Sequence, residues 1–330
     1  EGAATAGGTV APIVGAEEDS AQYTLINGYL KRTDVINLSA NNFGYDTSRF
    51  YLHPLISQGD VAGNWLSNAP TTQYANISDY GNLAMYSADI GSGTDLDKMV
   101  LIYFDKSGTQ LGTEDIDNLD ANGGFTTYGT TTNKQVMFFG CFPANLRNWS
   151  TLFNSPAVID FIEGGYYTVR AVNSSTETLL DIITINVNCP TLKGYEPIRL
   201  AWLNQWGVWD YYTFTMKSAK TTSTKGSTYQ QIEGTWNESL YQINGFKGGK
   251  KAFRVNATEK IKMNTDFVNE AESEWFEELI NSPEVYILDG DQSSSFPAFN
   301  QYATPVRLTT SSYTKKTVAN DKLIQYEFEV

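Results

Sequence analysis

The sequence predicts a mainly β protein, in which a β-sandwich-like N-terminal region precedes a β-rich α+β domain with one amphipathic helix. Three observations predict this fold. The 330 residues are 41% hydrophobic and 13% aromatic, enough to bury the cores of two domains of ordinary size. Short apolar runs rich in Thr, Tyr, Val and Ile alternate with Gly, Asn, Asp and Ser, which is typical of strands and turns. One stretch near residue 270 has a clear helical pattern.

Composition divides the chain into three parts. Residues 1–21 are small, Gly-rich and unpatterned, which predicts a flexible N-terminal arm. Residues 22–190 form the β-sandwich-like region, and a break near 90–98 would divide it into two sub-domains. The stretch Pro190–Pro197 contains a glycine and two prolines, so the main boundary is placed there. Residues 191–330 are the α+β domain, which we expect to make the oligomer contacts.

In the first region, two hairpins and one short helix are predicted. Met99–Phe104 is followed by a polar turn in which Gly108 can adopt the positive φ that a return strand needs. Tyr166–Val172 and Leu179–Val187 form the second hairpin around an Asn-Ser-Ser-Thr turn. The short helix is expected around Pro143–Phe153.

The second region begins with a further hairpin. Ile198–Leu203 and Val208–Met216 flank the turn Asn204–Gly207, whose glycine relieves the backbone. The glycine-rich segment Gly245–Lys251 lacks the spacing of a phosphate loop and predicts a turn with solvated lysines. Further strands are expected at Ser227–Glu233, Lys250–Val255, Glu284–Leu288, Thr304–Thr309 and Leu323–Val330.

The one amphipathic helix is expected to start near Glu270. Asn269 can cap its free N–H groups, and Glu272 stands three residues later, as in a capping box. Ser282-Pro283 ends the pattern. The helix carries an apolar stripe at a spacing of four: Ala271, Trp275 and Leu279. Its carboxylates are expected to form an ordinary solvated face: Glu270, Glu272, Glu274, Glu277 and Glu278.

Charge excludes several function classes. The net charge of −14 has the wrong sign for a protein whose affinity comes from neutralising phosphates, so no nucleic acid partner is expected. Residues 1–190 hold 8 basic and 20 acidic side chains, whereas 191–330 hold 15 and 17. No apolar run of about 18 residues occurs, so no membrane association is expected.

No catalytic, cofactor or metal-binding residues are predicted. One histidine and two cysteines cannot build a His/Cys-rich metal site within the chain. His53, followed by Pro54 in an apolar setting, would have to serve any Ser-His-Asp triad, but no G-x-S-x-G motif accompanies it. Packing or surface exposure is the preferred interpretation of this histidine.

Calcium is the one ion that the sequence leaves open. The stretch Asp115–Asp120 is similar to an EF-hand loop, but Asp120 stands where the loop needs glycine and Thr126 where it needs Glu. A looser site of loop carboxylates stays possible, at Asp95 and Asp97 or at Asp289 and Asp291, although solvated turns are the preferred interpretation.

Cys141 and Cys189 could form a disulfide, and two free buried thiols are an equal alternative. The aromatic cluster around the second-region hairpin offers candidate subunit contacts. If strands flank the turn, Trp206 projects from its tip, where an exposed ring would suit a subunit contact or sugar stacking. The candidate contacts are Trp206, Trp209 and Tyr211, whereas their neighbours Trp202 and Tyr212 are expected in the core.

Four segments carry a resemblance to a known family. Gly194–Lys225 (GYEPIRLAWLNQWGVWDYYTFTMKSAKTTSTK), Glu272–Tyr286 and Pro305–Phe328 occur in the order and near the spacing of that family, and Val136–Asn148 (VMFFGCFPANLRN) agrees with it. In these segments the chain resembles virion structural proteins of tailed marine bacteriophages, mainly over residues 194–330.

The resemblance implies a non-enzymatic, tail-associated virion component that assembles as a homo-oligomer. It implies a tail-tube or distal-tail-like module, with copies of itself and other virion proteins as partners and no catalytic residues. Three alternatives stay open: a capsid decoration protein, a carbohydrate-binding, receptor-binding adhesin that recognises host surface glycan through its first region, and a polysaccharide depolymerase.

Overall fold

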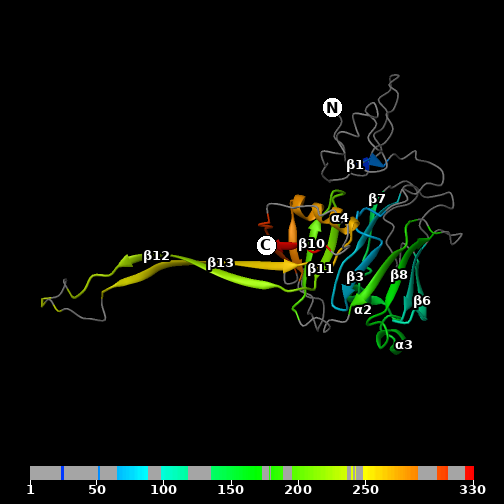
Figure 1. Cartoon of the computed structure of the whole chain (residues 1–330), viewed down its shortest axis with the longest axis horizontal. Helices are drawn as coiled ribbons and strands as arrows, with labels where there is room; N and C mark the ends of the chain where they lie inside the picture. The colour runs from blue at the N-terminus through cyan, green and yellow to red at the C-terminus, as the bar shows by residue number, and fades with distance from the viewer. Residues whose placement is uncertain are drawn as a thin grey trace, which may run out of the picture.

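A computed structural model describes residues 24–25, 51–52, 65–87, 98–117, 135–172, 178, 180–188, 195–235, 239–240, 242, 248–288, 303–310 and 324–330. Within these residues the fold is mainly β, with strands in several sheets, as the sequence predicts (Figure 1). We call residues 65–188 the N-terminal lobe and residues 195–330 the C-terminal lobe. The predicted N-terminal arm and residues 190–194 of the boundary segment lie outside the described residues, and the domain limits stay a prediction.

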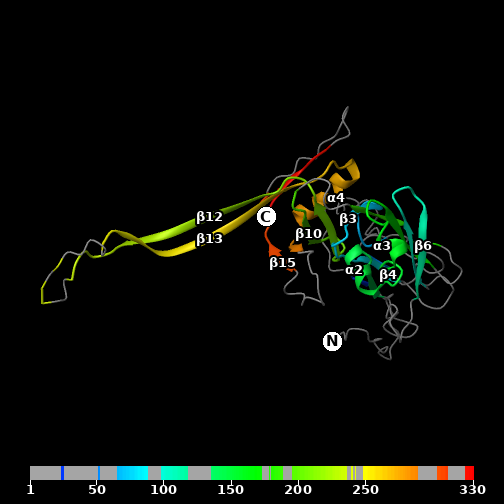
Figure 2. The ribbon, with the colours of Figure 1, turned by 90° about the horizontal axis from the view of Figure 1, so that it is seen from below.

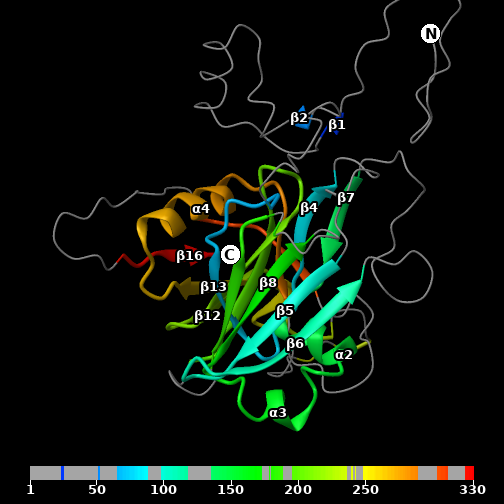
Figure 3. The same ribbon diagram turned by 90° about the vertical axis from the view of Figure 1, so that its right-hand side faces the viewer.

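The N-terminal lobe is built on a five-stranded sheet (Figure 3). All neighbours in the sheet are antiparallel except β3 and β9, which run parallel. Along β5 every second residue is buried, because side chains of a strand alternate between the two faces of its sheet. The strands, in sheet order, are β3 (Thr72–Asn76), β9 (Ile183–Asn188), β8 (Tyr166–Val172), β5 (Lys98–Phe104) and β6 (Gln110–Asp117).

The buried face of this sheet packs against helices and a second pair of strands. Phe142, Leu146 and Phe153 join Leu101 and Tyr167 in the first core. The predicted hairpins and the short helix are confirmed, and Gly108 has a φ of 84°. The covering elements are β4 (Leu83–Ser87), paired with β7 (Gln135–Phe139), and the helices α2 (Pro143–Trp149) and α3 (Pro156–Ile159). The β-sandwich stays a prediction.

The described N-terminal residues contribute one further pair of strands. The strands β1 (Thr24–Leu25) and β2 (Tyr51–Leu52) pair antiparallel.

The C-terminal lobe contains a four-stranded sheet and α4 (Glu270–Asn281), the one helix among its described residues. The predicted hairpin is confirmed, and Gly207 in its turn has a φ of 75°. Trp202, Phe214, Phe276 and Phe328 form much of the second core. The strands, in sheet order, are β11 (Trp209–Phe214), β10 (Ile198–Leu203), β14 (Val285–Leu288) and β15 (Ala303–Val306).

The capping box of α4 is present as predicted. The backbone N–H of Glu272 donates to the Asn269 side chain at 2.8 Å, and the Asn269 N–H donates to the Glu272 carboxylate at 2.7 Å. The stripe residues Trp275 and Leu279 are buried against the sheet. One detail differs: Glu278, expected on the solvated face, has no exposed surface.

The longest strands form a ribbon that leaves the body of the molecule (Figures 1 and 2). The strands predicted at Ser227–Glu233 and Lys250–Val255 are parts of β12 (Ala219–Gln230) and β13 (Lys250–Asn264), which pair antiparallel. The last strand, β16 (Glu327–Glu329), adds to the base of β13. We call residues 219–264 the β-arm.

Candidate functional site

The β-arm is a two-stranded ribbon that has solvent on both faces. Twelve residues of β12 and the first ten of β13 are exposed. At about 3.3 Å per residue, β12 alone is roughly 40 Å long. The β12 sequence AKTTSTKGSTYQ is rich in Thr, which favours extended backbone, but it has no apolar side to turn toward a core. A two-stranded ribbon in water is at best marginally stable alone, so it is suited to being covered by another surface.

The base of the β-arm belongs to the second core. Met263 is fully buried and pairs with Phe328 of β16, and Ile261 packs against the same cluster. The backbone groups of Ile261 and Val330 exchange two hydrogen bonds of 2.9 and 3.0 Å. The arm therefore leaves the body in a fixed direction.

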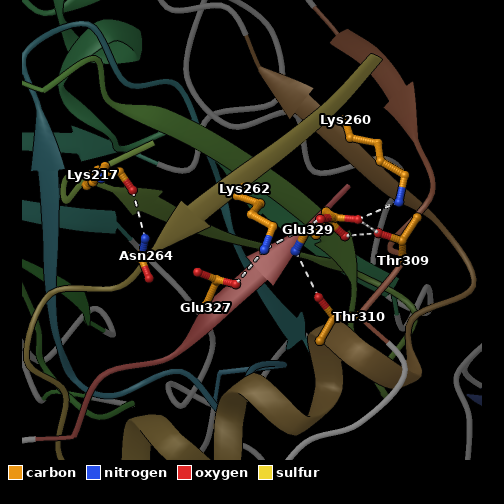
Figure 4. Close-up of polar contacts among 8 residues, drawn as sticks. All are labelled: Lys217, Lys260, Lys262, Asn264, Thr309, Thr310, Glu327 and Glu329. Carbon is orange, nitrogen blue, oxygen red and sulfur yellow. Dashed lines mark hydrogen bonds and ion pairs between the residues drawn. The ribbon is translucent and has the colours of Figure 1, made fainter. Parts of the chain in front are cut away.

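Ion pairs lie along the outside of this base (Figure 4). Lys260 Nζ lies 2.7 Å from Glu329 and Lys262 Nζ lies 3.1 Å from Glu327. The hydrogen bond from Lys260 lowers the pKa of Glu329, and that to Glu327 raises the pKa of Lys262. Exposed pairs of this kind contribute little, so the buried Met263 and the strand pairing hold the base. Figure 4 also shows contacts of Asn264 with Lys217 and of Thr309 and Thr310 with Glu329.

One face of the outer β-arm gathers cations and aromatic rings. Ser227 and Tyr229 share a face because side chains alternate along a strand, and their direct partners Arg254 and Lys251 lie on that face too. Phe253, between Ala252 and Arg254, is the extra residue of a bulge in the pairing and has no direct partner on β12. We call this the basic–aromatic face: Lys225, Tyr229, Lys251 and Arg254, together with Phe253 at the bulge beside them.

The basic–aromatic face is open to solvent. Phe253 is 78% exposed and Tyr229 46%. Lys225, Lys251 and Arg254 have no ion-pair partner among the described residues, and Arg254 Nε donates to Asn256 Oδ1 at 3.0 Å. Residues 219–264 carry eight basic and three acidic side chains in a chain of net charge −14. Exposed aromatic rings beside cations are typical of a surface that binds an acidic protein partner.

The candidate subunit contacts predicted from sequence do not lie on the β-arm. The expectation that Trp206 projects from its turn is wrong: it is only 6% exposed. Its turn lies against the body, where Asn204 Nδ2 donates to the carbonyl of Leu66 at 2.9 Å. Trp209 is half-buried, with its ring edge-on to Tyr286 at 5.4 Å. Tyr211 is half-buried and packs on Phe142 of the N-terminal lobe at 5.7 Å. The expected core positions of their neighbours hold for Trp202, which is fully buried.

Where Tyr211 lies, a buried ion pair joins the two lobes. Arg199 Nη1 lies 3.3 Å from Asp79 Oδ2 and donates to Thr213 Oγ1 at 2.7 Å. Arg199 Nε donates to the carbonyl of Tyr80 at 2.8 Å. Both charged side chains are at most 4% exposed, and the guanidinium lies over the rings of Phe142 and Tyr211. Removing one member of such a pair leaves a buried charge uncompensated, so the contact fixes the lobes against each other.

A second buried junction holds two carboxyl groups. Asp210 accepts hydrogen bonds from Ser67 Oγ and Trp275 Nε1, both at 2.7 Å. Glu278 accepts from the side chain of Asn68 and from a backbone N–H of the hairpin turn. Burial, and then the charge of Glu278, raise the pKa of Asp210 to about 7. These contacts tie residues 67–68 to the C-terminal lobe.

Several further predicted site residues lie elsewhere. Cys141 is buried, and Cys189 lies outside the described residues, so their pairing stays a prediction. His53 lies outside them too, as do the candidate calcium residues Asp95, Asp97, Asp289 and Asp291. Within the described ranges, no group of three or more His, Cys, Asp or Glu is placed to hold a metal ion. No helix in that part of the chain is long and apolar enough to cross a membrane.

Comparison with known proteins finds no relative: no family model, no curated protein and no solved structure matches this chain. The sequence predicts only the outer parts of the two arm strands, at Ser227–Glu233 and Lys250–Val255, and not their length or their exposure on both faces. The available signal was a Thr- and Lys-rich run from 219 to 230 in which neither alternating set is apolar.

Proposed function

We propose that this protein is a non-enzymatic structural subunit that assembles as a homo-oligomer through its β-arm, as a tail-associated component of a tailed bacteriophage virion. The observation that carries the assembly role is the β-arm itself, a ribbon in which all twelve residues of β12 and the first ten of β13 are exposed among the described residues. The resemblance of residues 194–330 to virion structural proteins supports the phage setting and the tail location.

Burial of the β-arm against another surface is energetically favourable. Among the described residues, its strands are exposed on both faces and, beyond the base where β16 pairs with β13, have no neighbouring strand on either outer edge. Large apolar side chains such as that of Phe253 lie in water there. Burying a ring such as that of Phe253 contributes about 1.5–3 kcal/mol. A neighbouring copy is always present where a subunit assembles, so it can supply the covering surface at every arm. The tail-tube or distal-tail-like ring that the resemblance implies would use this repeated contact.

Shortening the β-arm tests the assembly role. Residues 222–259 are replaced by Asn-Gly, so that Thr221 and Lys260, which are direct partners, flank a two-residue hairpin turn. The buried Met263 and the base remain. We expect the full chain to form oligomers in analytical ultracentrifugation and the shortened chain to sediment as a monomer with an unchanged melting temperature.

Two outcomes would contradict the assembly role: a shortened chain that assembles like the full chain, or a full chain that stays monomeric at all concentrations. Location is tested separately by immunogold labelling of purified particles. Gold on the tail supports the proposal, gold on the head indicates the capsid decoration alternative, and absence from particles overturns the virion assignment.

A further inference from the structure

The turn after α3 presents an aromatic ring between two carboxylates. Phe161 is 58% exposed, and its neighbours Asp160 and Glu163 are exposed as well. Neither carboxylate has an ion-pair partner within the described part of the chain. We call these three residues the α3 loop.

The α3 loop is anchored by buried neighbours and by the five-stranded sheet. Val158 and Ile162, on either side of Phe161, are fully buried in the first core. The backbones of Gly164 and Gly165 exchange hydrogen bonds of 2.9 Å with Val187 of β9, which attaches the end of the loop to the sheet. A fixed surface loses little conformational entropy on binding, which favours affinity.

The α3 loop complements the basic–aromatic face in charge and in apolar character. The loop offers one ring and two carboxylates, and the face offers two rings and three cations. The same relation holds at large scale, because residues 1–190 carry 8 basic and 20 acidic side chains, whereas the β-arm has an excess of five basic ones. Complementary charges steer association and reject wrong partners.

The shape of the molecule makes this contact intermolecular. The β-arm extends away from the N-terminal lobe, whereas α3 lies on the far side of the C-terminal lobe from the arm (Figures 1 and 2). The arm therefore points away from the α3 loop of its own chain. A second exposed ring beside a carboxylate is that of Phe267, which follows the base of β13 directly. A β-arm that docked there would collide with the β-arm of the second copy, so the α3 loop is the better receiving surface.

We propose that the basic–aromatic face of the β-arm docks on the α3 loop of a second copy of this chain. The inference rests on the proposed function and names the surface that receives the arm. Because the two surfaces differ, the contact is heterologous, and repeating it from copy to copy generates a closed ring or an open filament.

Two sets of substitutions by uncharged polar residues test the docking. The arm variant carries Phe253→Ser and Arg254→Ser, and the loop variant carries Phe161→Ser and Glu163→Gln. We expect each alone to raise the dissociation constant for self-association at least about thirty-fold. An equimolar mixture should form dimers and nothing larger, because the intact arm of one variant meets the intact loop of the other. Lys250→Ser, at an exposed position opposite Gln230 on the other face of the arm, is the matched control and should assemble normally.

Sedimentation of each variant and of the mixture decides between the possibilities. A loop variant that assembles like the unaltered chain overturns the α3 loop as the receiving surface, while the shortened arm still tests the proposed function. An arm variant that assembles normally overturns the role of the basic–aromatic face. Two monomeric variants with unchanged melting temperatures that form no dimer on mixing overturn the pairing of face and loop. A full chain that never self-associates overturns the proposed function instead.

Discussion

Asp210 is a single acid whose ionisation is opposed by its surroundings. It is buried where residue Ser67 crosses onto the C-terminal lobe, and a second carboxylate, that of Glu278, lies in the same junction. Folding therefore raises its pKa from an ordinary 3.8 to about 7, chiefly through loss of hydration. The folded chain holds this proton across that range while the unfolded chain releases it. The stabilisation is complete below pH 3.8 and is lost as the pH rises through about 7.

Asp210→Asn removes this titration, since the amide has the same shape and cannot ionise. We expect the free energy of unfolding of the unaltered chain to fall relative to the variant by about 2–4 kcal/mol between pH 4 and pH 8. Urea unfolding at several pH values measures the difference, with Asp181→Asn, at an exposed position outside the α3 loop, as control. Parallel pH profiles for Asp210→Asn and the unaltered chain would contradict the prediction.

At the scale of elements, α4 organises the second core. The ring of Trp275 lies 4.9 Å from that of Trp202, and the ring of Phe276 lies 4.8 Å from that of Tyr212, edge to face. The helix starts at its capping box, in which Asn269 satisfies a backbone donor that the helix itself leaves free. The capping box fixes where α4 begins, and the apolar stripe packs the same helix against the sheet.

Asn269→Ala removes the side-chain acceptor of this cap. We expect it to lower the free energy of unfolding by about 1 kcal/mol, because the N–H of Glu272 loses its partner. Asn269→Ser, which keeps a capping oxygen, serves as the control and should stay near the unaltered chain. Thermal and urea unfolding check both variants, and an Ala variant as stable as the Ser variant would count against the cap.

At the scale of the whole molecule, charge is distributed unevenly. The β-arm has eight basic and three acidic side chains, and it projects from a body that is strongly acidic. The arm also extends away from the rest of the described chain (Figures 1 and 2). Assembly by the proposed contact therefore brings unlike charges together.

Self-association should therefore weaken with salt. The Debye length, over which salt screens charges, shortens from about 10 Å at 0.1 M to about 3 Å at 1 M. We expect the dissociation constant for self-association to rise at least about ten-fold over that interval. Sedimentation at both salt concentrations measures it. The variant Lys251→Ala/Arg254→Ala should show a shallower dependence. Association that tightens with salt would instead indicate a contact driven by apolar burial.

The features predicted correctly are those with local causes. The turn glycines Gly108 and Gly207 have the positive φ that their hairpins need, and Asn269 starts α4. The features predicted wrongly depend on distant residues. Trp206 was expected at an exposed tip and Glu278 on a solvated helix face, yet both are buried. Nothing local to either residue indicates this: Glu278 accepts hydrogen bonds from Asn68 and from the hairpin turn, and that turn bonds to Leu66 through Asn204.

The sequence by itself determined the mainly β character, the hairpins and the capped helix, because hydrogen bonding, side-chain alternation and turn conformation act over a few residues. Only the tertiary structure decided which surfaces remain open. It placed the expected contact residue Trp206 inside and left β12, whose sequence has no apolar side, outside. The physical reason is that exposure depends on which segments meet across the chain, and that depends on packing of the whole molecule.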